Sequence, residues 1–259
     1  MKKYKTGPLM SAISRKIGRA IADYDMLHDG DKVIVAVSGG KDSSSLLPLL
    51  RYRQTFAPIK FELLAVHVRF GNRGVPPAPL GDRVAALGVP LLVENVESEI
   101  VREGESLNCF WCAWHRRKTL FKMAGRLGFN KIALGHHFDD IVETILLNLF
   151  YRGEVGAMKP RQDLFGGKLS IIRPLAYVDE AMVRRFFLDE LKGETLACTC
   201  PRREETARLA VKNLLKDLEK QNPRIKWNIF RALRNIKEEY LLDTADEIDA
   251  PFFSAPDRR

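Results

Sequence analysis

Short apolar runs recur along the first two thirds of the chain. Five of them are rich in β-branched or other apolar residues, and we expect each to form a strand. They cover residues 33–37, 61–68, 90–95, 131–137 and 169–175. The first run ends in two glycines, a pattern typical of a buried parallel strand that opens into a loop.

Segments with apolar residues at helical spacing lie before and between these runs. Residues 9–28 place a stripe of Met and Ile side chains on one face. Further helices are expected after residue 42, despite Pro48, and over residues 139–152. Strands separated by helices predict βαβ units, and so an α/β fold with a doubly wound parallel sheet. Such sheets bind ligands at the carboxyl ends of their strands.

The strand pattern stops after about residue 200. Two amphipathic helical runs follow, over residues 204–220 and 225–240. The pattern therefore predicts a sheet domain with a helical C-terminal region. We expect four parts: an N-terminal helical segment (1–29), the sheet domain (30–200), a basic helical region (201–240) and an acidic, flexible tail (241–259).

Composition narrows the class of protein. The 259 residues are 46% hydrophobic, enough for a full core. The N-terminus has no signal-peptide pattern, and no run approaches the ~20 apolar residues of a membrane span, so we expect a cytoplasmic protein without membrane contact. Net charge is +9, and residues 202–237 hold 11 Lys or Arg against 4 Asp or Glu. Such a region suits a nucleic-acid partner, although a solvated helix face is the simpler alternative.

The segment SGGKDS, residues 38–43, follows the first expected strand and opens a helix. Its two glycines let phosphate oxygens approach the backbone, whose amide groups would point at the anion. Lys41 adds positive charge, and Ser38 and Ser43 can donate hydrogen bonds. The spacing differs from the G-x-x-x-x-G-K-[ST] loop. The sequence thus predicts a phosphate site of another kind.

The segment GHHFDD, residues 135–140, follows the fourth expected strand. Carboxylates at a helix start are also what helix capping favours. At the same sheet edge as SGGKDS, however, a carboxylate could orient Mg²⁺ or activate an attacking group. We expect Asp139 to take part in the chemistry, Asp140 to support it and His136 to lie near a nucleotide.

The cysteines form two close pairs, Cys109 with Cys112 and Cys198 with Cys200. Four uses compete: a redox couple, a structural zinc site built from all four thiolates, a persulfide carrier, or an iron–sulfur cluster with three protein ligands. The thiols by themselves leave these alternatives open.

Taken together, the motifs resemble one family. SGGKDS, C-x-x-C before RRK at 116–118, GHHFDD, IIRPLAY at 171–177 and a late cysteine followed by a helix look like the tRNA 2-thiocytidine synthetases, the TtcA family. These are PP-loop ATP pyrophosphatases with an adenine nucleotide alpha hydrolase-like fold, and the TtuA-type tRNA thiolases are their relatives. The likeness runs from about residue 10 to about residue 240 and keeps the order of every motif.

The resemblance implies a set of site residues. Catalysis falls to Asp139 and Lys41, and Mg²⁺ to Asp42 and Asp140. ATP would contact residues from both loops and a neighbouring strand: Ala36, Val37, Ser38, Gly39, Gly40, Lys41, Asp42, Ser43, Val66, Gly135 and His136.

The resemblance also implies a 4Fe–4S cluster held by Cys109, Cys112 and a third, later cysteine. We choose Cys200, because Arg208 follows it by eight residues as in the family, and keep Cys198 as the alternative. Trp111, Trp114 and Arg173 have several possible roles. Candidate RNA contacts are Arg116, Arg117, Lys118, Arg202, Arg203 and Arg208.

The implied reaction is tRNA thiolation. ATP adenylates O2 of a cytidine, at position 32 of the anticodon loop, and sulfide on an open iron replaces that oxygen with release of AMP. Expected partners are tRNA, sulfide or a sulfur-donor protein, and a second copy of the chain. Two alternatives remain: a PP-loop tRNA-modifying enzyme with another base or nucleophile, and a zinc-stabilised nucleotide- or RNA-binding protein.

Overall fold

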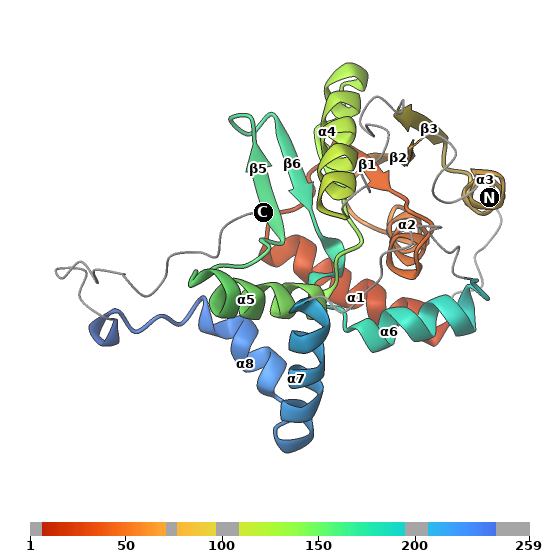
Figure 1. Cartoon of the computed structure of the whole chain (residues 1–259). Coiled ribbons are helices and arrows are strands. Elements are labelled where there is room, and N and C mark those ends of the chain that lie inside the picture. Colours follow the sequence, from red (N-terminus) through yellow and green to blue (C-terminus); the bar gives the residue numbers. More distant parts are fainter. Residues whose placement is uncertain (1–6, 71–76, 97–108, 195–206, 242–259) are drawn as a thin grey trace, which may run out of the picture.

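The described residues form a six-stranded sheet flanked by helices (Figure 1). The structure is a computed structural model that describes residues 7–70, 77–96, 109–194 and 207–241. Its strands are β1 (Asp31–Ala36), β2 (Phe61–Phe70), β3 (Leu91–Val96), β4 (Lys131–Ala133), β5 (Arg161–Leu164) and β6 (Leu169–Ile172). They are arranged in the order β3-β2-β1-β4-β6-β5.

Strand direction follows the doubly wound pattern. All neighbouring pairs from β3 to β6 are parallel. The chain moves outward from β1 to β3, then returns to place β4 on the other side of β1. The strand order therefore reverses between β1 and β4, and a crevice at the carboxyl ends of these two strands is the usual ligand position in such sheets.

One strand departs from the predicted parallel sheet. β5 pairs with β6 antiparallel, and the hairpin turns through Phe165, Gly166 and Gly167, all with positive φ. β5 was not predicted, because its sequence RQDL has one apolar residue and so lacks the apolar run that is typical of a buried strand. β5 is polar because it lies at the edge of the sheet, where a strand is not buried on both faces.

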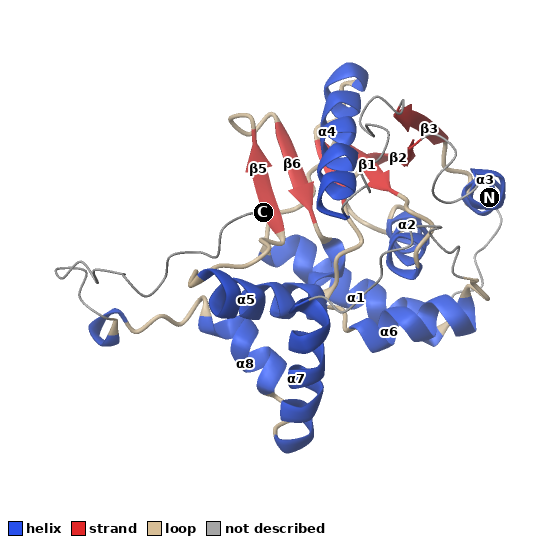
Figure 2. Ribbon diagram, in the orientation of Figure 1, coloured by secondary structure: helices blue, strands red, loops and turns tan. Residues whose placement is uncertain are grey.

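Helices cover both faces of the sheet (Figure 2). The α-helices are α1 (Pro8–Asp23), α2 (Lys41–Arg53), α3 (Pro77–Ala86), α4 (Cys109–Leu127), α5 (Phe138–Arg152), α6 (Glu180–Arg185), α7 (Ala207–Gln221) and α8 (Ile225–Ala232). Shorter helical turns are η2 (Pro174–Tyr177), η3 (Phe186–Glu190) and η4 (Glu238–Tyr240). None of the described helices is long and apolar enough to span a bilayer.

The core has two layers because side chains alternate along β1. Val33 and Val35 belong to the larger cluster, which also holds apolar residues of α1, α2 and α5. Ile34 belongs to the other cluster and packs with Leu120 and Met123 of α4. Burial on both faces explains why the central strands are continuous apolar runs.

Several predicted boundaries were too long. The strand expected to reach residue 137 ends at Ala133, and the one expected to reach 175 ends at Ile172. The first leaves residues 134–137 as a loop above the sheet. Pro174 explains the second, because it begins a 3-10 helix that turns the chain away.

The helical C-terminal region packs on the sheet domain through α5. Val211 and Leu215 of α7 and Phe230 of α8 are buried in the larger core cluster. The predicted helix over 225–240 is broken: α8 ends at Ala232, and η4 follows six residues later. In Figure 1, α7 and α8 (blue) lie beside α5 (green) at the carboxyl-end side of the sheet.

Candidate functional site

Two loops meet where the strand order reverses. The first, residues 37–40, follows β1, and the second, residues 134–137, follows β4. A Cβ atom added to Gly135 would lie 2.9 Å from the Ser43 backbone nitrogen and 3.0 Å from the Asp42 carbonyl carbon. No side chain fits at such distances, so Gly135 allows the second loop to rest directly on the first turn of α2.

The first loop is shaped to receive an anion. Gly39 has φ +82°, a conformation that glycine adopts without strain. Gly40 is the N-cap of α2, and among the described residues no side chain caps that helix end. The first-turn amide groups and the positive end of the helix dipole therefore remain available to a bound anion.

Hydrogen bonds hold this loop in place. The Ser38 backbone amide donates to the Ser43 hydroxyl oxygen at 3.0 Å, and the two hydroxyl groups are also 3.0 Å apart. The buried His67 of β2 forms a 2.7 Å hydrogen bond between its Nδ1 and the Val37 carbonyl oxygen. The Val37 amide donates to the Val66 carbonyl oxygen at 2.9 Å. Val37 and Val66, which were both predicted to contact ATP, thus join the loop to β2 through a main-chain hydrogen bond.

The start of α5 is fixed by a capping box. The His137 amide donates to Asp140 Oδ2 at 2.9 Å, and the Asp140 amide donates to His137 Nδ1 at 3.3 Å. The plain capping role expected for a carboxylate here is therefore filled by Asp140. Its side chain also lines the cavity described next.

A cavity of about 1,200 Å³ lies over the two loops. Its described lining contains seven Lys or Arg side chains and three Asp side chains, so the local charge favours an anionic ligand. The cationic residues are Arg116, Arg117, Arg152, Lys159, Arg161, Arg173 and Arg208, and the acidic ones are Asp42, Asp140 and Asp163.

Arg173 is the most deeply buried of these cations. Its exposed fraction is 6%, and its guanidinium donates to the Lys159 carbonyl oxygen. In the described part of the chain no carboxylate oxygen lies within 4 Å of it, and its Nε has no hydrogen-bond partner. Burial, and then the charge of Arg117, lowers the pKa of Arg173 to about 10. A buried guanidinium that stays charged without a carboxylate suits an anionic ligand.

His136 supplies an uncharged polar group to the same cavity. Burial is the largest influence on its pKa, which falls to about 4 although the Asp140 carboxylate opposes the change. The imidazole is therefore neutral at pH 7. Its Nδ1 is buried and finds no partner among the described residues. A neutral ring with one open position can donate to or accept from a bound base or nucleotide.

Asp139 lies elsewhere. Its exposed fraction is 6%, and it does not line the cavity. Oδ2 accepts a 2.7 Å hydrogen bond from the Glu180 amide at the start of α6, and Oδ1 is 2.9 Å from Lys226 Nζ of α8. Asp139 therefore ties the first turn of α5 to two other helices.

Lys41 does not line the cavity either, and its side chain forms two ion pairs. Its Nζ is 2.8 Å from Asp42 Oδ1 and 3.1 Å from Glu180 Oε1. The other Glu180 oxygen is 2.6 Å from Lys212 Nζ of α7. Burial by itself would raise the pKa of Glu180, but hydrogen bonds from Lys212 and Lys41 lower it to about 2. Glu180 thus connects the start of α2 to α7.

The structure brings together most of the predicted site residues that it describes. Those that line the cavity are Ala36, Ser38, Gly40, Asp42, Ser43, Arg116, Arg117, Gly135, His136, Asp140 and Arg208. Those that do not are Val37, Gly39, Lys41, Val66, Lys118 and Asp139. Lys118 instead lies over the Trp114 ring, 4.8 Å from its centroid. Arg208 reaches from α7 to within 3.9 Å of Asp140 and 3.3 Å of Glu143.

The described residues include only part of the predicted cysteine site. Cys109 begins α4, and Cys112 lies one turn later, partly buried, next to the cavity-lining Ala113. The Cys109 side chain, Cys198, Cys200, Arg202 and Arg203 lie outside the described residues. Within the part that is described, no three His, Cys, Asp or Glu side chains form a metal-binding group.

One row of polar side chains in the cavity was not predicted. Thr144, Asn148 and Arg152 line the cavity and follow Asp140 at intervals of four residues along α5. This spacing places them on one helix face, so the pattern could have been found. Arg161 and Asp163 belong to the unpredicted β5, and Lys159 lies two residues before it; none of the three had such a signal.

Known proteins with similar sequences identify the family of this chain. A family model described as PP-loop domain matches residues 9–191. The tRNA-cytidine(32) 2-sulfurtransferase of Geobacter sulfurreducens is 40% identical over 89% of this chain and 92% of its own length. The enzyme of the same name from Burkholderia multivorans is 39% identical over 93% of this chain and 74% of its own length.

A solved structure shows a similar fold. It is the U34-tRNA thiolase NcsA from Methanococcus maripaludis with its [4Fe-4S] cluster, matched with a TM-score of 0.73 over 90% of this chain and 80% of that one. The two sequences are 23% identical. The resemblance drawn from the sequence motifs is confirmed: the chain belongs to the tRNA-cytidine(32) 2-sulfurtransferase family of PP-loop proteins.

Proposed function

We propose that this protein is an ATP-dependent tRNA sulfurtransferase that replaces O2 of a cytidine, at position 32 of the anticodon loop, with sulfur. One observation carries the proposal. A cation-lined cavity lies over the N-terminus of α2 at the switch point of the sheet, and Asp42 and Asp140 enter it from the first turns of α2 and α5. The similar enzymes named for this reaction support the choice of substrate.

ATP would bind with its phosphates over the first turn of α2. The amide groups after Gly40 face the anion, and Gly39 and Gly40 leave room for its oxygens. Arg173 is the charged side chain best suited to hold a phosphate, because it is buried and lacks a carboxylate partner among the described residues. Asp42 and Asp140 are the carboxylates proposed for Mg²⁺, since both line the cavity from the first turns of α2 and α5, whereas Asp163 lies on β5 and pairs with Arg161.

Adenylation makes the cytidine oxygen a leaving group. O2 attacks the α-phosphorus and pyrophosphate leaves; sulfur then bonds to C2, and the C–O bond breaks to release AMP with the former cytidine oxygen. The neutral His136 can hydrogen-bond to the base while the reaction proceeds. Lys41, held by Asp42 and Glu180, keeps positive charge beside the phosphate loop.

The residues at the α4 end of the cavity fit an iron–sulfur cluster. Cys109 and Cys112 are one helical turn apart, and Cys112 adjoins the cavity wall. The chain returns to the same cavity at Arg208, eight residues after Cys200. Three thiolates would hold a 4Fe–4S cluster with one open iron, which can bind sulfide. The sulfide, free or from a donor protein, would thus be presented toward the activated base.

The RNA would approach over the same basic lining. Arg116, Arg117 and Arg208 line the cavity, and Lys118 is exposed on α4 beside Trp114. Arg202 and Arg203 lie just before α7 in the sequence. We expect these residues to contact tRNA phosphates. A homodimer remains the expected assembly.

Metal content tests the cluster. Purified without oxygen, the wild-type protein should contain about four iron and four labile sulfide per chain. Cys112→Ser and Cys200→Ala should lose most of both, while Cys198→Ala, the matched control in the same segment, should retain them. Zinc without iron in the wild-type protein would contradict the cluster, and loss of iron in Cys198→Ala alone would transfer the third ligand to that residue.

The two aspartates should have separable roles. Asp140→Asn should reduce formation of thiolated cytidine by about 100-fold with little change in stability, since the amide oxygen can still accept the capping hydrogen bond. Asp139→Asn should lower the free energy of unfolding by about 1–3 kcal/mol, because it weakens the contact with the largely buried Lys226. Thermal unfolding and RNA mass spectrometry measure the two effects. A stable, inactive Asp139→Asn beside an active Asp140→Asn would reverse the assignment.

Arg173 should matter for ATP. Arg173→Gln should raise the Kd of ATP by at least about tenfold, measured by calorimetry without RNA. Arg161→Gln is the matched control, because Arg161 lines the same cavity but is paired with Asp25 and Asp163. Equal ATP affinity in Arg173→Gln and the wild-type protein would rule out this phosphate contact.

A further inference from the structure

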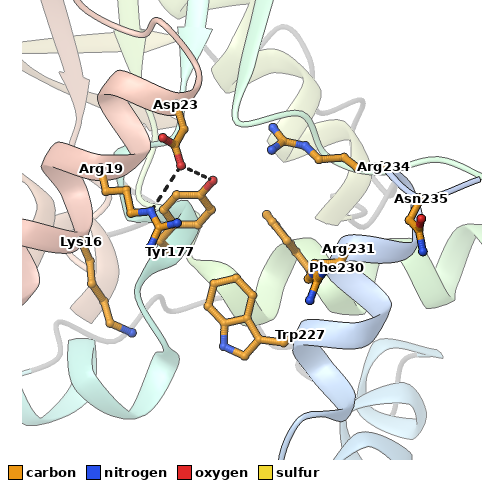
Figure 3. Close-up of a pocket in the computed structure, with 9 residues that line it drawn as sticks. All are labelled: Lys16, Arg19, Asp23, Tyr177, Trp227, Phe230, Arg231, Arg234 and Asn235. Atoms are coloured by element: carbon orange, nitrogen blue, oxygen red, sulfur yellow. Dashed lines mark hydrogen bonds and ion pairs between the residues drawn. The ribbon is translucent and has the colours of Figure 1, made fainter.

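A second cavity lies on the other side of the α5 start. Its volume is about 500 Å³, within the roughly 300–1,000 Å³ of small-ligand sites. Figure 3 shows that its side chains come from α1, from η2 and from the α8 region. They are Lys16, Arg19, Asp23, Tyr177, Trp227, Phe230, Arg231, Arg234 and Asn235. No residue of this set lines the first cavity.

Three neighbouring aromatic side chains line this cavity. The centroids of Trp227 and Phe230 are 5.8 Å apart, and Tyr177 lies 6.1 Å from Trp227 and 6.0 Å from Phe230. Tyr177 and Phe230 are buried, but Trp227 keeps 39% of its surface exposed. An indole held by packing and still open to solvent is a stacking platform for a planar group.

The charge around these rings is positive. Of the four cations, Lys16 pairs with Asp179 at 2.8 Å, and Arg19 is 3.5 Å from Asp23. Asp23 is the single carboxylate among the described lining residues, and its Oδ2 also accepts a 2.9 Å hydrogen bond from the Tyr177 hydroxyl (Figure 3).

The two arginines of the α8 region differ from the other cations. Across the described ranges, no carboxylate oxygen lies within 4 Å of Arg231 or Arg234. Arg234 instead lies over the Tyr24 ring, 4.6 Å from its centroid. Both guanidinium groups therefore remain available to an anion.

We propose that this cavity binds one unstacked nucleotide of the RNA substrate, with the base on Trp227 and a phosphate on Arg231 and Arg234. This inference rests on the proposed tRNA sulfurtransferase function. An aromatic platform beside unpaired arginines is the combination that proteins use for single-stranded nucleotides. A purely apolar ligand would leave the arginines without an anion, and a free inorganic anion would leave the rings unused.

The position of the cavity suits a nucleotide near the reacting base. The first turn of α5 separates the two cavities: Phe138 packs against Trp227 with centroids 4.6 Å apart, whereas Asp140 lines the first cavity. A helix with its side chains is about 10–12 Å wide. A loop of RNA that places its cytidine in the first cavity could therefore set a neighbouring nucleotide in the second, and so hold the RNA in register.

Binding of unmodified tRNA to the full-length protein tests the proposal. Arg231→Gln and Arg234→Gln should each raise the Kd by about tenfold and reduce the slope of log K against log salt concentration by about one. Arg224→Gln is the matched control: it removes the same charge from an exposed residue at the start of α8 that does not line the cavity. The KM for tRNA should rise in both variants, while kcat at saturating tRNA and the Kd of ATP should stay unchanged.

A second measurement reports on stacking directly. In a Trp111→Phe, Trp114→Phe background, Trp227 is the only tryptophan, and tRNA should quench its fluorescence. Cytidine monophosphate at the same concentration should not, because the rest of the RNA supplies most of the affinity. Equal quenching by the mononucleotide would identify a free-nucleotide site and overturn the RNA proposal.

The outcomes separate this inference from the proposed function. If wild-type protein binds and thiolates tRNA, but Arg231→Gln and Arg234→Gln bind it as tightly as Arg224→Gln, the second cavity is not an RNA site and the enzyme assignment stands. If wild-type protein fails to bind tRNA at all, both proposals are wrong.

Discussion

The close contact between Gly135 and the first turn of α2 sets the geometry of the whole site. A parallel sheet whose strand order reverses leaves a crevice between the loops after β1 and β4. Here the backbone of the second loop lies so near to Ser43 that a Cβ atom would overlap it. The uncapped helix end, His136 and Asp140 are consequently held in one fixed arrangement. Any side chain at position 135 would push the two loops apart and so separate the anion site from Asp140.

Electrostatics extend this arrangement to the C-terminal helices. Glu180 lies between Lys41 of α2 and Lys212 of α7, and Asp139 pairs with Lys226 of α8. Partly buried charges of this kind are costly unless they are paired, so their pairing fixes where α7 and α8 dock. The helices in turn bring Arg208 to the first cavity and Trp227 to the second. The basic charge of the C-terminal region thus has a structural role beside its expected contact with RNA.

The sequence predicted the parts of the site that depend on local pattern. Buried parallel strands are apolar along their whole length, and the loops after them carry glycines and polar residues, so the β1 and β4 loops could be found and expected at one edge. The sequence could not predict which of the two aspartates, Asp139 or Asp140, faces the cavity. Successive helix residues differ by about 100° in direction, and the packing of α5 against α6 and α8 decides that Asp140 points in and Asp139 points away. Arg173 is similar: its isolation from carboxylates depends on neighbours that are distant in sequence.

The affinity of Gly135→Ala for ATP tests the central claim most directly. The added methyl group must displace the backbone at Ser43 or the loop that carries it, an overpacking that costs about 1–3 kcal/mol. Gly156→Ala is the control, because a Cβ atom there meets only the Asn148 side chain at 3.7 Å. Calorimetry should show ATP binding weakened by about tenfold or more in Gly135→Ala, with the folded state retained and Gly156→Ala unchanged. A folded Gly135→Ala with wild-type ATP affinity would contradict the account.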